Sequence, residues 1–212
     1  MLPTLISALR ETLYMVLYST LFSMLIGIPL GMWVIGLSYS KNGFNRGLSA
    51  TLHAILLAVK ATPYILVMLL FIPTTNWLIN HHISFTGATI VPLSVAGTML
   101  IAQAVCEIFK ELMSKWQSTT KSMGATSKQT MLLILLPESL TRILETCSNT
   151  AATILGFSII AGAFGAGGLG QLAIEKTITE PNFLYAIISI VTLIAIQQIF
   201  KYTAILILPP KT

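Results

Sequence analysis

Three long intervals of this 212-residue sequence carry no aspartate, glutamate, lysine or arginine. They cover residues 12–40, 61–106 and 146–174, and most of their side chains are apolar. An α-helix needs about 20 mostly apolar residues to cross the hydrocarbon core of a bilayer, so each interval can supply at least one crossing. Since lipid offers no partner to backbone N–H and C=O groups, continuous apolar segments of this kind cross as helices. The intervals therefore predict an all-α membrane protein.

The three intervals supply four predicted spans, and Pro181–Phe200 opens a fifth, all within a single domain, 1–212. The middle interval is too long for one crossing, and it is interrupted by Pro73-Thr74-Thr75-Asn76 and by His81-His82. The spans are predicted at about 12–37, 58–79, 88–108, 143–163 and 183–208, with a polar loop at about 110–137. Five spans would place the two termini on opposite sides of the membrane.

Composition narrows the classes of function. Only 9% of the residues are charged, against about a quarter in a soluble domain. There are seven acidic residues, all glutamate, which argues against acid-rich metal cages and paired-carboxylate active sites. Cys106 and Cys147 lie at the ends of apolar segments without CxxC spacing, which predicts apolar packing instead of a disulfide or zinc site. We expect no catalytic residue, cofactor or metal.

The distribution of lysine and arginine predicts the orientation. With the N-terminus outside, the outer segments hold only Arg10 and Lys176. The cytoplasmic segments then hold Lys41, Arg46, Lys110, Lys115, Lys121, Lys128, Arg142, Lys201 and Lys211. Positive charge favours the cytoplasmic side, so we expect an inner-membrane protein with a cytoplasmic C-terminus. Because these residues lie at the ends of apolar segments and not in one patch, the net charge of +5 does not indicate nucleic-acid binding.

The loop at 110–137 has a pattern of its own. Thr126 and Gln129 have the spacing of a capping box, which opens a helix just after Gly124. Before it, the helical spacing of Trp116, Thr119, Thr120 and Met123 predicts a short helix along the membrane surface. We therefore expect two short helices joined by a turn at Gly124, with Pro137 opening the fourth span. The pattern fits either an interfacial helix or a docking element for a cytoplasmic partner.

Several motifs along nearly the whole chain resemble ABC importer permeases, most closely the methionine-importer permeases. The sequence MGAT at 123–126, followed by LPE at 136–138, resembles the EAA loop of those proteins. The other motifs are ETL at 11–13, IGIPLG at 26–31, KATPYI at 60–65, IVPL at 90–93 and GAFGAGGLG at 162–170. Any one of these would be weak, but several in the right order indicate the family.

The resemblance implies a homodimer of five-span subunits in which each EAA loop is a coupling helix seated on one of two cytoplasmic ATP-binding subunits. A periplasmic substrate-binding lipoprotein would deliver the substrate. The sequence has no GxxxxGK[ST] motif, so ATP hydrolysis is assigned to the partner and this chain is not expected to be an enzyme. The implied docking residues are Ser118, Lys121, Gly124, Ala125, Thr126, Leu136 and Pro137.

The sequence departs from the family pattern at six positions, two of which are Met113 and Lys115, where methionine permeases tend to carry a proline and a glycine. By register from Gly124, Ser118 replaces the signature glutamate of the EAA loop and Thr119 replaces the alanine that follows. An arginine and a glutamate typical of the third span are replaced by Gln103 and Cys106. These changes leave the expected fold untouched and concern the contacts with the ATPase.

The fourth span carries the predicted translocation pathway. Hydroxyl and amide groups at this depth face a bundle interior or a cavity, where they either form hydrogen bonds between helices or contact the substrate. The glycine-rich run that follows matches GxGxxG but lacks the strand–helix context of a dinucleotide site, so a flexible turn near an outer gate is favoured. The predicted pathway and gate residues are Asn149, Thr153, Phe157, Ile160, Gly165, Gly167 and Gly170.

The function predicted from these features is import of methionine, as either enantiomer, or of a related amino acid. An osmoprotectant importer of the glycine betaine type is the alternative within transport. A membrane scaffold that docks a cytoplasmic partner without transporting anything is the alternative from another class. Membrane lipid is expected around the chain in each case.

Overall fold

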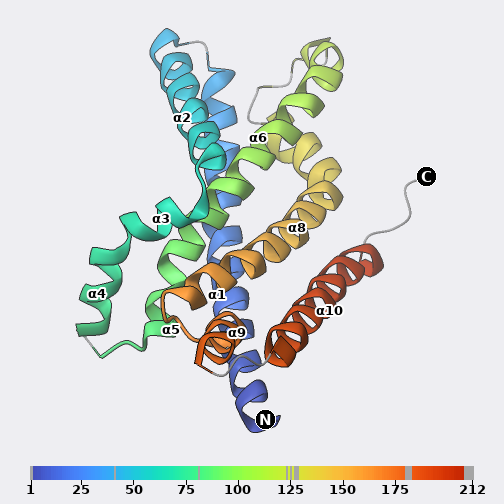
Figure 1. The fold of residues 1–212 in the computed structure, drawn as a ribbon. Coiled ribbons are helices and arrows are strands. Elements are labelled where there is room, and N and C mark those ends of the chain that lie inside the picture. The colour runs from blue at the N-terminus through green and yellow to red at the C-terminus, as the bar shows by residue number, and fades with distance from the viewer. Residues whose placement is uncertain are drawn as a thin grey trace.

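The computed structural model describes residues 2–40, 42–80, 82–122, 124, 126, 129–179 and 183–207, and nearly all of this part of the chain is helical (Figure 1). The long helices are α1 (Leu2–Ser38), α2 (Gly43–Ala61), α6 (Ile90–Ser122), α8 (Leu136–Ala163) and α10 (Phe183–Ile207). The shorter elements are α3 (Tyr64–Leu70), α4 (Ile72–Asn80), α5 (Phe85–Ala88), the π-helix η1 (Thr130–Leu135) and α9 (Gly168–Thr179).

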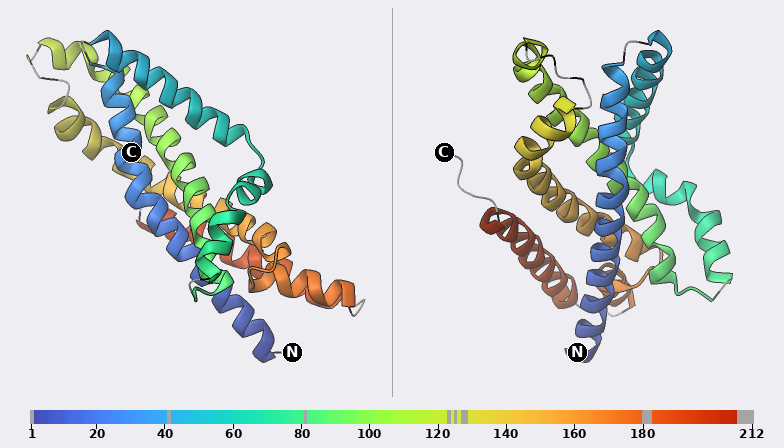
Figure 2. Two further views of the ribbon diagram at one scale, coloured as in Figure 1. Left: turned by 90° about the vertical axis from the view of Figure 1, so that its left-hand side faces the viewer. Right: turned by 180° about the vertical axis from the view of Figure 1, so that it is seen from behind.

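Helices α1 and α6 form the centre of the molecule and lie side by side (Figure 2). Glycine allows their backbones to approach closely: a Cβ on Gly31 would lie 2.5 Å from the carbonyl oxygen of Ala102. A Cβ on Gly27, one turn earlier, would lie 2.9 Å from the carbonyl oxygen of Thr98. Small residues four apart are typical of helix pairs in membranes, where van der Waals packing drives association. The IGIPLG motif is therefore the contact surface of this helix pair.

Three helical stretches are long and apolar enough to cross a membrane: Pro3–Ser38, Phe85–Trp116 and Thr130–Ala163. A fourth candidate is the bent pair Gly43–Val59 and Tyr64–Leu70, whose axes differ by 105°. The apolar part of α10, Ile187–Tyr202, is shorter. The described residues thus give an all-helical, membrane-type fold with three to four candidate spans.

The predicted span at about 58–79 is wrong as a single helix. The helix α2 ends at Ala61, and Thr62 is extended with φ −79° and ψ 128°. The reason is Pro63, whose ring excludes the helical conformation from the preceding residue. The break expected at Pro73 lies two residues earlier, at Phe71, because α3 ends at Leu70 and α4 begins at Ile72. Pro73 is the second residue of α4, and proline is tolerated in the first turn of a helix.

The predicted surface helix before Gly124 is also wrong. Helix α6 runs without interruption from Ile90 to Ser122. Its last four turns contain no glycine or proline, and Glu111 lies four residues before Lys115, a spacing that stabilises a continuous helix. The second predicted helix is η1, which continues into α8. There the N–H of Leu136 bonds to the carbonyl of Met131, five residues back, just before Pro137, which has no N–H to donate.

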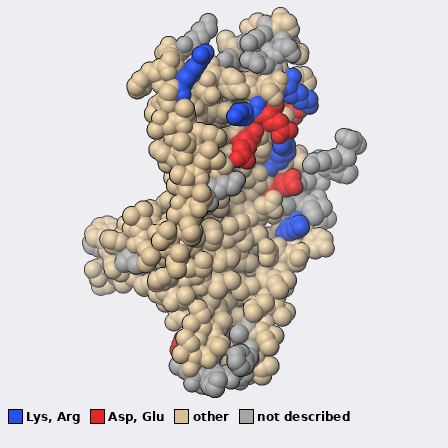
Figure 3. Space-filling view, turned by 45° about the horizontal axis from the view of Figure 1, so that its top comes forward, with Lys and Arg blue, Asp and Glu red and all other residues tan. Residues whose placement is uncertain are grey.

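Charged side chains gather at one end of the molecule. Figure 3 shows most of the visible lysine, arginine and glutamate residues over the upper end, while the lower body is almost entirely uncharged in this view. That end holds the last turn of α1, the first turn of α2 and the last turns of α6 (Figure 1). The segregation agrees with a protein whose apolar body lies in lipid and whose charged end faces water.

Candidate translocation and coupling sites

The polar side chains of α8 fall into two groups. Ser148 donates to the carbonyl of Phe200 on α10 at 2.6 Å, whereas Thr150 and Ser158, both buried, bond to carbonyls of their own helix. Asn149 and Thr153, in contrast, are exposed on the surface of the chain. The hydrogen bonds of the first group stabilise α8 itself and its contact with α10. The second presents an amide and a hydroxyl on the outside of a candidate span.

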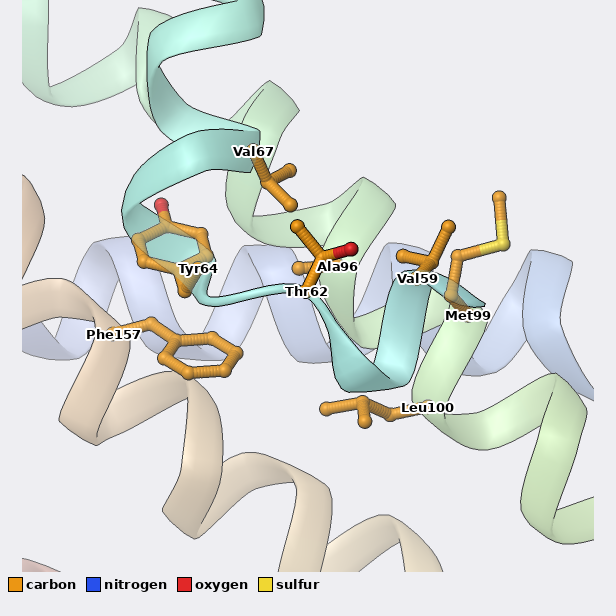
Figure 4. Close-up of a pocket in the computed structure, with 8 residues that line it drawn as sticks. All are labelled: Val59, Thr62, Tyr64, Val67, Ala96, Met99, Leu100 and Phe157. Carbon is orange, nitrogen blue, oxygen red and sulfur yellow. The ribbon is translucent and has the colours of Figure 1, made fainter. Parts of the chain in front are cut away.

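Phe157, one turn after Thr153 on α8, is half-buried and lines a small pocket (Figure 4). Its ring stacks on that of Tyr64, with centroids 4.3 Å apart and planes at 6°. Val59, Thr62, Tyr64 and Val67 contribute to the lining from α2 and α3, and Ala96, Met99 and Leu100 contribute from α6. The pocket therefore lies at the break made by Pro63, and its walls are mostly apolar.

The glycine-rich turn after α8 is held against the first helix. The turn requires positive φ angles, and φ is 90° at Gly165, 91° at Gly167 and 75° at Gly168. The N–H of Gly168 donates to a carboxylate oxygen of Glu11 at 2.8 Å. The N–H of Leu169 donates to the hydroxyl of Thr12 at 2.9 Å. Two side chains of α1 thus satisfy the first two of the free N–H groups at the start of α9.

The same turn leaves no room for larger residues at two further positions. A Cβ on Gly170 would lie 2.7 Å from the backbone of Ile159, and one on Gly162 would lie 2.5 Å from the amide nitrogen of Gln171. Gly165 is different, since no described atom lies within 4 Å of its Cβ position. Ile160 is half-buried and packs against the core cluster on this side of the molecule. The predicted gate residues therefore divide into packed positions and one exposed turn.

The predicted coupling loop turns at Gly124, which has φ +68° and is exposed. The N–H of Thr126 donates to the side-chain oxygen of Gln129 at 2.9 Å, and the N–H of Gln129 donates back to the Thr126 hydroxyl at 3.4 Å. This reciprocal pair confirms the predicted capping box. Ser118 and Lys121 belong to α6, but their side chains, like all of Ala125, lie outside the described residues.

Two ion pairs brace the ends of this loop. Lys115 lies 3.0 Å from Glu138, and Arg142 lies 2.6 Å from Glu111. Each pair joins the last turns of α6 to the first turns of α8, close to Leu136, which is half-buried, and Pro137, which is exposed. Exposed pairs contribute little stability, but two of them across one junction restrict how the loop leaves the helices.

The two unusual residues of the third predicted span are buried inside the protein. Gln103 is 1% exposed and donates from its amide to Glu107 at 2.9 Å. Cys106 is also 1% exposed, and its thiol donates to the carbonyl of Gly31 at 3.3 Å. Cys106 thus packs within the contact of α1 with α6, as apolar packing predicts.

Sequence reasoning assigned no role to Glu11, Thr12 or Tyr64, although all three lie in the quoted motifs. The signal for Glu11 was available, because it is the last charged residue before a charge-free interval of 29 positions, 12–40. A carboxylate at such a boundary is costly unless it has partners. Its partner is 157 residues away along the chain, so the pairing itself could not be read locally.

Relatives of this chain are transport permeases. It is 34% identical over 192 residues to the probable D-methionine transport system permease protein MetI of Pasteurella multocida, covering 89% of this chain and 88% of the relative. The corresponding protein of Vibrio cholerae is 32% identical over 199 residues, covering 93% and 87%. The D-methionine transport system permease protein MetI of Escherichia coli K12 is 32% identical over 158 residues, covering 74% and 72%.

Solved structures give the same result for the fold. A structure of the MetNI methionine ABC transporter in an inward-facing conformation superposes with a TM-score of 0.86 at 29% identity, covering 98% of this chain and 95% of that one. An amino acid ABC transporter structure gives a TM-score of 0.74 at 19% identity and supports the fold alone. Residues 27–206 match the family model described as the inner membrane component of binding-protein-dependent transport systems. The chain therefore belongs to this family of ABC importer permeases.

Proposed function

We propose that this chain is the permease subunit of an ATP-driven importer that moves methionine, or a closely related amino acid, across the inner membrane. The observation that carries the proposal is the exposure of Asn149 and Thr153 on α8. Both lie inside the candidate span Thr130–Ala163. The Thr153 hydroxyl donates to the Asn149 carbonyl at 3.0 Å, but the Asn149 amide would be costly facing lipid, so this face needs water, substrate or another protein against it.

A second copy of the chain completes the pathway in this proposal. The α8 face of Asn149 and Thr153 continues to Gly156, where no described atom lies within 4 Å of the Cβ position. A small residue beside two polar ones is typical of contacts between helices in membranes. Two such faces, one from each subunit, would enclose a polar passage, and the pocket at Tyr64 and Phe157 would lie beside it.

The proposed domain is one bundle with five crossings: α1, α2 with α3, α6, α8 and α10. The N-terminus lies outside and the C-terminus lies in the cytoplasm. The charge distribution supports this orientation, because the lysine- and arginine-rich end holds the loop at 110–137. The glycine-rich turn of Gly165 and Gly167 is then the outer gate, latched by Glu11 and Thr12.

The loop at 110–137 is the proposed docking site for the ATP-binding subunit, two copies of which would serve the dimer. It presents an exposed turn at Gly124, held by the capping box of Thr126 and braced by the two ion pairs at its base. Ser118, Lys121 and Ala125 are proposed contacts from the sequence. An exposed turn that joins α6 to α8 can transmit movement of the ATPase to both helices.

Methionine is the proposed substrate because the curated relatives are named as D-methionine permeases. The chemistry of the chain agrees with a zwitterion that has a soft, apolar tail. There is no charged residue between 146 and 174, so a strongly charged substrate would lack a counter-charge there. The pocket beside Phe157 offers Met99 and Leu100, whose polarizable and apolar surfaces suit a thioether.

Uptake by vesicles tests this proposal. Vesicles that contain the permease, its ATPase and its periplasmic binding lipoprotein are loaded with ATP on the ATPase side, and entry of radiolabelled methionine is followed. We expect uptake that requires ATP and that unlabelled methionine suppresses more strongly than glycine betaine does. Suppression by betaine and not by methionine would refute the substrate. Absence of ATP-dependent uptake of either compound would refute import.

A further inference from the structure

A second pocket lies at the charged end of the molecule, between the end of α1, the start of α2 and the passing α6. Its cavity volume is about 150 Å³, below the range of about 300–1,000 Å³ for sites that enclose a whole small molecule, so it suits a single group such as a phosphate. Arg46, His53 and Lys110 line it together with the hydroxyls of Ser38 and Tyr39. We propose that this pocket binds the phosphate of an anionic phospholipid head group.

The charges in the pocket are all of one sign. None of the described lining residues is acidic, whereas Arg46 and Lys110 are cationic and His53 can donate an N–H. Arg46 donates its Nε–H to the carbonyl of Ser40 at 2.9 Å, which fixes the guanidinium and leaves its terminal N–H groups for another acceptor. A planar guanidinium and an ammonium on two different helices suit a phosphodiester, which is anionic and accepts several hydrogen bonds.

Neighbouring carboxylates have other partners. Glu111, next to Lys110 in the chain, pairs with Arg142 at 2.6 Å, and Glu107 accepts a hydrogen bond from Gln103 at 2.9 Å. Among the residues that the structure describes, neither Arg46 nor Lys110 forms an ion pair. Within the described part of the chain, the two cations of the pocket therefore lack an ion-pair partner, and an anionic ligand would supply one.

The position of the pocket indicates a lipid and not a soluble anion. Arg46 and His53 belong to one face of α2, and Leu57 continues this face one turn deeper, where it is 46% exposed. Trp33, 54% exposed, lies on α1 five residues before Ser38, and exposed tryptophan is enriched at the membrane–water interface. A cationic pocket above an exposed apolar surface matches a head group with its acyl chain. Pockets of this kind between membrane helices bind anionic lipids on the cytoplasmic side.

Native mass spectrometry of the purified, full-length permease with its ATPase tests this inference. The complex is titrated with phosphatidylglycerol and, separately, with phosphatidylcholine. The test variant is the double change Arg46→Gln and Lys110→Gln, and the control is Lys201→Gln, which removes an exposed lysine of α10 away from the pocket. Because all three side chains are exposed, the substitutions should leave folding intact, which size-exclusion profiles and melting curves check.

We expect the wild type and Lys201→Gln to retain phosphatidylglycerol in preference to phosphatidylcholine, and the double variant to bind it at least about tenfold more weakly, about 1.4 kcal/mol. Arg46→Lys, which keeps the charge, should keep most of the binding. Equal binding by all variants would overturn the proposal, as would equal retention of the two lipids. If inorganic phosphate displaces phosphatidylglycerol with the same dependence on Arg46 and Lys110, the site belongs to a soluble anion and the lipid proposal fails.

Discussion

Replacing Gly31 by alanine should destabilise the protein even though alanine is the better helix former. The added Cβ would lie 2.5 Å from the carbonyl oxygen of Ala102 and 2.8 Å from the Cβ of Val105. The first of these atoms belongs to the backbone of α6, so it cannot rotate away, and the two central helices must separate. Overpacking of this kind costs about 1–3 kcal/mol.

Gly47→Ala is the matched control. Gly47 also lies inside a helix, α2, but it is exposed and no described atom lies within 4 Å of its Cβ position. Both substitutions gain the same helix propensity, about 0.5–1 kcal/mol, which cancels when they are compared. The free energy of unfolding in detergent micelles should therefore be about 1–3 kcal/mol lower for Gly31→Ala than for Gly47→Ala. If the two variants are equally stable, the close contact of α1 with α6 is not what the structure describes.

Three further predictions concern the outer turn, the pathway and the topology. Thr12→Val should lower the free energy of unfolding by about 1–3 kcal/mol, because the buried N–H of Leu169 loses its acceptor. Thr12→Ser keeps the hydroxyl and should cost less. Equal effects of the two substitutions would exclude the hydrogen bond as the cause. Asn149→Leu should lower methionine uptake roughly tenfold, because the loss of one polar contact costs about 1.4 kcal/mol. The variant should still assemble, and unchanged uptake would show that Asn149 does not line the pathway. In a background without native cysteines, a cysteine replacing Ser84 should react with an impermeant thiol reagent from outside intact cells, and one replacing Ser114 should not; the opposite result would invert the orientation.

The helical membrane fold could be predicted because charge-free intervals are a local property of the sequence. Where the chain bends inside such an interval is harder to predict, since each proline acts according to its place in a helix. Pro63 directly follows the end of α2, whereas Pro73 lies in the first turn of α4, two residues after the break at Phe71. Pattern alone favoured the second proline, because polar residues follow it.

In the candidate site, contacts between residues close in the sequence could be predicted, and contacts between distant residues could not. The capping box of Thr126 and Gln129 spans four residues and was predicted correctly. The hydrogen bond from Gly168 to Glu11 joins residues 157 positions apart, and the stacked rings of Tyr64 and Phe157 belong to separate helices. Neither contact follows from sequence spacing. The exposure of Asn149 on α8 likewise depends on which neighbours cover the helix.

Capture of the ATP-binding subunit tests most directly whether this chain is an importer permease energised through its loop. The full-length chain is affinity-purified from detergent-solubilised native membranes, as wild type, as Gly124→Trp and as the control Gly43→Trp. Gly124 has φ +68°, where a side chain is strained, and both glycines are exposed with no described atom within 4 Å of the Cβ position.

We predict that the wild type and Gly43→Trp capture a protein with a Walker A motif in a one-to-one ratio, and that Gly124→Trp forms the dimer but loses this partner. Capture at wild-type strength by Gly124→Trp would contradict the docking role of the loop. Purification of the wild-type chain without any such ATPase would contradict the central claim.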